Sequence, residues 1–257
     1  MFIPGLVSIT FRRLGPAEVV RLVAQAGLRT IEWGGDVHVP PGDLARAREV
    51  RQLTADAGLT VAAYGSYYRA GTGKAPAFAA VLDSATALGA GVIRVWAGER
   101  GSAETDAAGR AAVADDLRRA GELAAAAGIR LALEWHGNTL TDTLASALAL
   151  VRATGLPPAA LGFYWQPSVN RPAAVCREEL AAIQARLVHL HAFHWQGHER
   201  LPLADGDGVW PEYLRQAAGT GRDHAVLLEF VRNDDPEQFL ADAKTLIRWL
   251  GAEAGRG

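Results

Sequence analysis

Leu131-Ala132-Leu133-Glu134-Trp135-His136 is a short apolar run that leads into a carboxylate. Gly128 precedes it, and an apolar run of this length bounded by glycine is typical of a buried β-strand. Three further runs end in a polar residue in the same way: 161–165 before Gln166, 188–190 before His191, and 226–228 before Glu229. Segments of helical length and pattern separate these runs, which indicates a parallel sheet with helical crossovers.

The same alternation extends along the whole chain of 257 residues. Strands are expected to begin near residues 2, 29, 59, 92, 130, 161, 187 and 225. Helical patterns occupy 16–26, 43–57, 75–88, 106–127, 142–153, 173–185, 211–218 and 235–250, and several end at a glycine. Eight such units with right-handed crossovers predict a single (β/α)8 barrel domain over residues 1–250, with a closed parallel sheet, ahead of an open doubly wound sheet. Residues 251–257 are expected to form a frayed tail.

The amino-acid composition and net charge limit which kinds of molecule the protein is expected to bind. Hydrophobic residues make up 49% of the chain and charged residues 21%, which is an ordinary globular balance. The net charge of −2 and the lack of a basic stripe disfavour nucleic acid and anionic membranes as partners. The first residues lack the pattern of a signal peptide and no long apolar window occurs, so we expect a cytoplasmic protein without a membrane span. A small-molecule ligand is the expected partner, and the sequence is compatible with a homo-oligomer.

Polar residues at the strand ends define the candidate site. A parallel barrel brings the C-terminal ends of its strands to one mouth, where enzymes of this architecture carry out their chemistry. Strand parity turns Glu134 and Glu229 towards the barrel interior and places His189 and His191 on one face. Two carboxylates, an imidazole and the amide of Gln166 converging there can hold a divalent metal and move protons. The alternative is a buried salt-bridge network that closes the barrel, and His189 is equally consistent with a satisfied core histidine.

Aromatic and basic residues near the mouth are candidates for binding substrate. These candidates are Trp33, Trp96, His38, His136 and His194. For each, packing at the barrel end or a supporting role is an alternative of similar weight. Parity turns Trp135 and Trp165 towards the helices, and Arg94 is expected to pair with a core glutamate such as Glu32.

The ordered set of strand-end residues resembles the xylose isomerase-like (β/α)8 barrels, which include ketose 3-epimerases, hydroxypyruvate isomerase and inosose dehydratase. In that family Glu, Asp, His and Glu at the ends of the last four strands hold Mn, Mg or a similar ion. The resemblance implies Glu134, His191 and Glu229 as metal ligands, with Gln166 where the family has Asp. A neutral amide oxygen removes one negative charge, so a hard cation should bind more weakly.

The resemblance also implies the chemistry. We expect a metal-assisted isomerase, epimerase or dehydratase that acts on a sugar, polyol or small hydroxy-carbonyl compound through an enediolate, with Glu134 and Glu229 moving the proton. Thr139-Leu140-Thr141 stand where 3-epimerases carry a further Glu, which disfavours that activity in particular. The rival hypothesis is a metal-free or non-catalytic member that binds a small ligand, for which Gln166 is the main evidence. A related DNA-repair endonuclease would need a basic face and more metal ligands.

Overall fold

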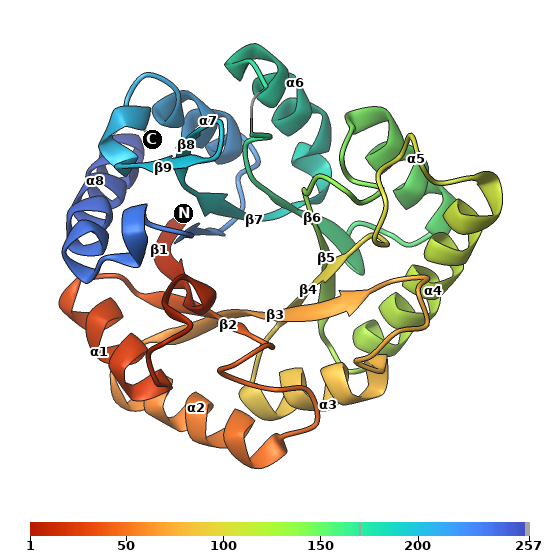
Figure 1. Cartoon of the computed structure of the whole chain (residues 1–257), viewed down its shortest axis with the longest axis horizontal. Helices are drawn as coiled ribbons and strands as arrows, with labels where there is room; N and C mark the ends of the chain where they lie inside the picture. Colours follow the sequence, from red (N-terminus) through yellow and green to blue (C-terminus); the bar gives the residue numbers. More distant parts are fainter. Residues whose placement is uncertain (170, 255–257) are drawn as a thin grey trace.

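Eight parallel strands form one closed barrel in the computed structural model, which describes residues 1–169 and 171–254. The barrel order is β1-β10-β7-β6-β5-β4-β3-β2, and the helices surround it as an outer ring (Figure 1). The barrel strands are β1 (Phe2–Val7), β2 (Thr30–Gly34), β3 (Thr60–Arg69), β4 (Val92–Trp96), β5 (Arg130–Glu134), β6 (Leu161–Trp165), β7 (Leu187–Ala192) and β10 (His224–Leu228). The predicted (β/α)8 barrel is therefore confirmed.

The helices follow the strands in strict alternation. They are α1 (Pro16–Gln25), α2 (Leu44–Asp56), α3 (Phe78–Leu88), α4 (Ala107–Ala126), α5 (Leu144–Thr154), α6 (Ala173–Ile183), α7 (Trp210–Ala218) and α8 (Pro236–Ala254). Asp43 and Asp106, expected as first helical residues, are N-caps whose carboxylates accept from the backbone N–H groups of Arg46 and Gly109. Neither described helix of 18 residues or more is apolar enough to cross a membrane.

Two helix boundaries and one additional hairpin are the main differences from the sequence prediction. α3 begins at Phe78 rather than at residue 75, because Pro76 disfavours helical backbone in the residue before it. α8 continues to Ala254, so residues 251–254 of the expected tail are helical, and residues 255–257 lie outside the described residues. The long connection after β7 contains an unpredicted antiparallel hairpin, β8 (His194–Gln196) with β9 (Glu199–Leu201).

The barrel interior is lined with small residues that leave room for polar groups at the mouth. Its lower layers are apolar and include Ala63, Ala132 and Leu227. Gly65 on β3 lies against the Glu32 and Arg94 side chains and leaves no room there for a larger residue. A Cβ atom there would lie 2.5 Å from Glu32 Oε1 and 2.9 Å from Arg94 Nη2. The glycine therefore makes space for a buried ion pair just below the mouth.

Candidate active site

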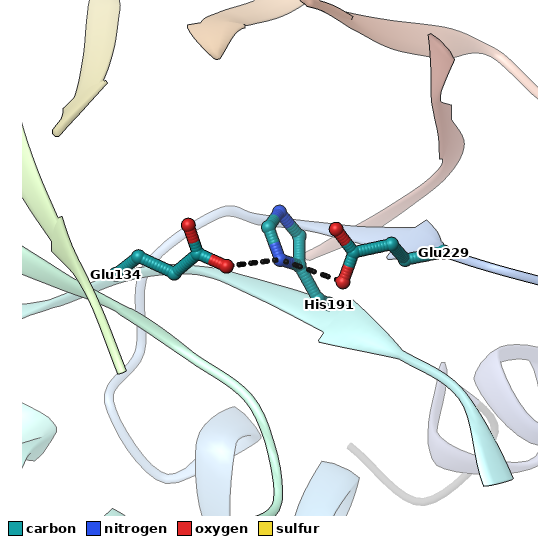
Figure 2. A group of neighbouring side chains, drawn as sticks. All are labelled: Glu134, His191 and Glu229. Atoms are coloured by element: carbon teal, nitrogen blue, oxygen red, sulfur yellow. Dashed lines mark ion pairs between the residues drawn. The ribbon is translucent and has the colours of Figure 1, made fainter. Parts of the chain in front are cut away.

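Glu134, His191 and Glu229 meet at the C-terminal mouth of the barrel. Glu134 is the last residue of β5, His191 lies in β7, and Glu229 directly follows β10. All three are buried, and one potential ligand atom from each lies within 4.8 Å of the others. His191 Nδ1 is 3.3 Å from Glu229 Oε2 and 3.9 Å from Glu134 Oε1. Figure 2 shows the two carboxylates approaching the imidazole ring from opposite sides.

Gln166 completes this cluster from the end of β6. Its amide Nε2 donates to Glu134 Oε1 at 3.5 Å, and its Oε1 accepts from His191 Nδ1 at 3.1 Å. The four residues that the sequence placed together therefore do lie together. Carboxylate and amide oxygens with one imidazole form a donor set that suits Mg or Mn, so the residues present fit a divalent ion.

A buried ion-pair network fixes the orientation of Glu134. Arg94 Nε donates to Glu32 Oε1 at 2.7 Å, and its Nη1 donates to Glu134 Oε2. The indole Nε1 of Trp96 donates to the same Glu134 oxygen. Oε2 is thus occupied by protein donors while Oε1 faces His191. The predicted pairing of Arg94 with Glu32 is confirmed, and Arg94 also holds Glu134.

Glu32 also holds His191, a contact that the sequence did not predict. Its Oε2 lies 3.1 Å from His191 Nε2, so His191 Nδ1 is turned towards Glu134 and Glu229. Burial alone would lower the pKa of His191, but the carboxylates of Glu229 and Glu32 raise it to about 10. Without an ion the imidazole carries a proton on both nitrogens, and a metal would have to displace the proton on Nδ1.

The backbone after β10 turns Glu229 inward. Its N–H donates to the carbonyl of Ala192 at 3.1 Å, which extends the pairing with β7 by one residue. Phe230 then adopts a φ of 53°, a left-handed conformation that is costly for a bulky side chain. Its N–H donates to Thr10 Oγ1 at 3.1 Å, which helps to hold this turn.

A cleft of about 690 Å³ opens directly above the cluster. Glu134, Gln166 and Glu229 form part of its lining, together with His136, Arg171 and Phe230. The ring of Trp96 lies 5.7 Å from that of His136, and the Arg69 guanidinium covers the indole at 3.9 Å. His136 therefore lines the cleft and Trp96 lies beside His136, while the contact of either residue with a substrate stays a prediction.

Two of the candidate substrate-binding residues lie elsewhere. Trp33 is fully buried and its Nε1 donates to Thr54 Oγ1 of α2 at 3.1 Å. His38 is also buried, and its Nε2 donates to the Leu14 carbonyl at 3.0 Å while its Nδ1 accepts from Ser8 Oγ at 2.9 Å. Both side chains have structural partners, and neither lines the cleft. The prediction that they contact substrate is therefore wrong.

The remaining aromatic and histidine candidates are placed as follows. Trp135 and Trp165 pack against the helices as parity predicted, since Trp135 Nε1 donates to Glu179 of α6 and the Trp165 ring lies 5.1 Å from that of Tyr213 in α7. His189 is a core residue whose Nδ1 accepts from the backbone N–H of Ala225. His194 lies on β8 and lines a neighbouring cavity rather than the main cleft.

Comparison with solved structures shows the same fold at low sequence identity. The probable 3-DHS dehydratase AsbF of Bacillus anthracis, involved in petrobactin synthesis, is 22% identical with a TM-score of 0.77, over 96% of this chain and 99% of that one. A xylose isomerase-like TIM barrel protein from Mycobacterium smegmatis, solved with magnesium, is 18% identical with a TM-score of 0.72, over 95% and 91%. D-psicose 3-epimerase from Clostridium cellulolyticum H10 is 15% identical with a TM-score of 0.70, over 96% and 97%.

Comparison of sequences alone gives the family. No curated protein matches the chain. The sequence profile described as xylose isomerase-like TIM barrel matches residues 20–251, which is most of the chain and includes every member of the cluster at the mouth. The chain belongs to the xylose isomerase-like TIM barrel family.

Proposed function

We propose that this protein is a divalent-metal-assisted isomerase, epimerase or dehydratase that acts on a sugar, a polyol or a small hydroxy-carbonyl compound. The observation that carries the proposal is the pair of buried carboxylates, Glu134 and Glu229, on opposite sides of His191 below an open cleft. Structural neighbours include proteins described as epimerases and as a dehydratase, which supports a sugar-modifying enzyme.

Glu134, Gln166, His191 and Glu229 would hold the ion. When bound, a divalent cation would polarise a substrate carbonyl and its neighbouring hydroxyl, which makes the proton on the adjacent carbon easier to remove. Glu134 has one oxygen fixed by Arg94 and Trp96, so its position is rigid. Glu229 receives a side-chain contact only from His191 among the described residues, and that contact is to Oε2. Its Oε1 is therefore available to accept a proton from a substrate carbon.

Glu134 and Glu229 would share the proton transfer. Inversion of a carbon centre would need Glu134 to enter the step carrying a proton taken from solvent in the cleft: Glu229 would remove the substrate proton from one face, Glu134 would deliver its own to the other, and both groups would be reset by exchange with solvent. Return of the proton by Glu229 to the neighbouring carbon would isomerise the substrate. A proton delivered to a leaving hydroxyl would instead complete a dehydration. In the loop after β5, Thr141 Oγ1 donates to the Glu134 carbonyl and Thr139 Oγ1 donates to the His136 carbonyl. These hydroxyls hold the loop at the position where a 3-epimerase would need a carboxylate. We therefore regard 3-epimerisation of ketoses as less favoured than the other reactions.

The experiment that tests this proposal follows hydrogen exchange at carbon. The purified protein, loaded with Mn, is incubated in deuterium oxide with a panel of ketoses, inososes and hydroxypyruvate, and both label and product are measured by NMR. Label next to the carbonyl of one compound, or formation of its product, supports the proposal. A hydride shift gives product with little label, which is why both are followed.

A second candidate function is a non-catalytic barrel that binds a small ligand without turnover. Gln166 favours it, because its amide bridges Glu134 Oε1 and His191 Nδ1, the two atoms that would face an ion. In this arrangement the cluster satisfies its own hydrogen bonds. Binding of a panel compound with neither label nor product would favour this candidate.

Replacing Gln166 with Asp should tighten Mn binding. The change places a negative charge beside His191, where Gln166 Oε1 now lies 3.1 Å from Nδ1. An added carboxylate in a partly buried site is expected to raise the affinity for Mn about tenfold or more. Calorimetric titration of both forms at one pH measures the difference. Equal affinities would show that Gln166 is not a ligand and that another group completes the coordination.

Replacing Glu32 with Gln should weaken Mn binding by about 10–100-fold, because a carboxylate that holds a ligand histidine fixes the ring and raises its basicity. The amide keeps the volume and still accepts from His191 Nε2, so the fold should survive. Glu179→Gln is the matched control, because Glu179 is also a buried glutamate but its partners are Trp135 and Ser168. An equal loss of affinity in both variants would contradict a specific role for Glu32.

A further inference from the structure

A second cavity lies beside the main cleft, between the start of α6, the hairpin strand β8 and the start of α7. We call it the side pocket; its own lining includes Ala173, Cys176, His194, Val209, Trp210 and Tyr213, and its volume is about 210 Å³. The two cavities share Pro167, Ser168, Val169, Arg171, Phe193 and Trp195 as lining residues. The two cavities therefore adjoin along these six residues, next to a ligand at Glu134 and Glu229.

Flat aromatic rings dominate the side pocket. The rings of Phe193 and Trp195 lie 5.3 Å apart, and those of Trp210 and Tyr213 lie 5.6 Å apart at 84°. Such walls favour another ring in an edge-to-face or offset contact. An apolar cavity of about 150 Å³ is large enough to bind benzene, so the side pocket has room for one substituted six-membered ring. A polyhydroxylated chain would lose water there without gaining enough partners.

Two polar groups of the side pocket have no hydrogen bond or ion pair among the described residues: the exposed Arg171 guanidinium and the buried Nε1 of Trp195. Arg171, which lines both cavities, makes no ion pair with any carboxylate in residues 1–169 and 171–254. The charge of Arg171 reaches the nearby Glu179 carboxylate and opposes the rise of its pKa that burial causes, but Glu179 accepts its hydrogen bonds from Trp135 and Ser168. Trp195 Nε1 is buried without an acceptor, and an unsatisfied buried donor is costly unless a ligand supplies the acceptor.

We propose that the substrate carries a second part besides the hydroxy-carbonyl group that reacts at Glu134 and Glu229. This part is an aromatic six-membered ring with an anionic substituent. The ring occupies the side pocket and the anionic group pairs with Arg171 at its entrance. The inference rests on the proposed function, because it names the substrate class of the same site. Compact free sugars would then bind only through the cluster at the mouth.

Cys176 provides the test, because it is the only cysteine of the chain and its side chain lines the side pocket. Burial raises the pKa of its thiol, so alkylation by iodoacetamide is followed at alkaline pH by mass spectrometry. Benzoate is the probe, with benzyl alcohol and fructose as comparisons, all without added metal. Benzoate at about ten times its dissociation constant should slow alkylation about tenfold, because only the empty pocket reacts. Benzyl alcohol should protect only at higher concentration, and fructose should not protect.

Two variants separate the contributions of the ring and of the charge. Arg171→Gln should weaken protection by benzoate about tenfold, to the level of benzyl alcohol, while Arg21→Gln on the exposed face of α1 should not. Ala173→Leu fills the side pocket and should abolish protection by both ring compounds. Calorimetric titration of benzoate gives an independent measure of binding. Absence of benzoate binding to the unmodified protein, or equal protection by fructose, would overturn the proposal.

The outcome is independent of turnover. Conversion of a free ketose without benzoate binding would overturn the two-part substrate and leave the proposed function standing. Benzoate protection that depends on Arg171, in a protein that converts neither a panel compound nor a hydroxy-carbonyl compound bearing an anionic aromatic ring, would retain the side pocket as a ring-binding site and remove the isomerase. Full protection by benzoate in Arg171→Gln would overturn the claim that an anionic substituent of the substrate pairs with Arg171.

Discussion

Changing Glu229 to Gln should abolish deuterium exchange into the substrate and reduce kcat by about 10²–10⁴-fold, the usual contribution of a positioned general base. The amide has the same volume and can still accept a hydrogen bond from His191, so the fold and the shape of the cleft should persist. It cannot take a proton from carbon. The loss should therefore appear mainly in turnover, with a smaller change in the affinity for substrate.

The measurement compares initial rates of label and of product in the two proteins at saturating Mn. Saturation matters because Glu229 is also a proposed ligand, and the variant will need more metal to fill its site. Glu122→Gln, a change on the exposed face of α4, is the control and should behave like the unmodified protein. Undiminished exchange in Glu229→Gln under these conditions would remove Glu229 from the chemistry and leave Glu134 as the base.

Much of the barrel could be predicted from the sequence because its signals are local. Every barrel strand except the longer and more polar β3 is a short, mainly apolar run, and the expected strand starts fall within one residue of the observed ones. The cluster at the mouth follows from the same signals, because parallel strands in a barrel must end at one rim. This is why Glu134, Gln166, His191 and Glu229 could be grouped although they span almost a hundred residues.

The predictions that failed concern contacts that no local pattern encodes. His38 lies in a loop, and its partners Ser8 and Leu14 come from the connection between β1 and α1, 30 and 24 residues earlier. His194 lines the side pocket and not the main cleft, because the unpredicted hairpin β8–β9 carries it there, and its contact with a substrate stays a prediction. Both placements depend on how loops pack over the barrel end.

Two residues of β2 show which side-chain directions strand parity alone predicts and which contacts it does not. Glu32 is a lone charge in an apolar strand and points into the barrel, so its neighbour Trp33 must point to the helix layer. Parity was sufficient to exclude Trp33 from the mouth. The pairing of Glu32 with His191 required more, because the two residues are 159 positions apart and meet only across the closed barrel.

Changing Arg94 to Met should destabilise the protein by about 3–5 kcal/mol, the usual cost of removing one partner from a buried ion pair. Arg94 is buried and lies between two buried carboxylates, Glu32 and Glu134, so its loss leaves both without a cation on that side. Urea denaturation with a chelator present measures the free energy of unfolding. Arg119→Met is the control, because the Arg119 side chain is exposed in its ion pair with Asp116 and should contribute less than about 1 kcal/mol.

The pH dependence distinguishes uncompensated charge from lost packing. Burial alone would raise the pKa of Glu32, and the charges of Arg94 and His191 overcome that effect and lower it. A carboxylate with a lowered pKa in the folded protein stabilises it above the unfolded pKa of about 4.3, and this stability is lost as the pH falls. Without the charge of Arg94, burial should raise the pKa of Glu32 in the folded variant. The folded variant should therefore take up a proton more readily as the pH falls. The stability difference between the two proteins should therefore shrink from pH 7 to pH 4, whereas a cavity left by the missing guanidinium would give a difference that does not change with pH.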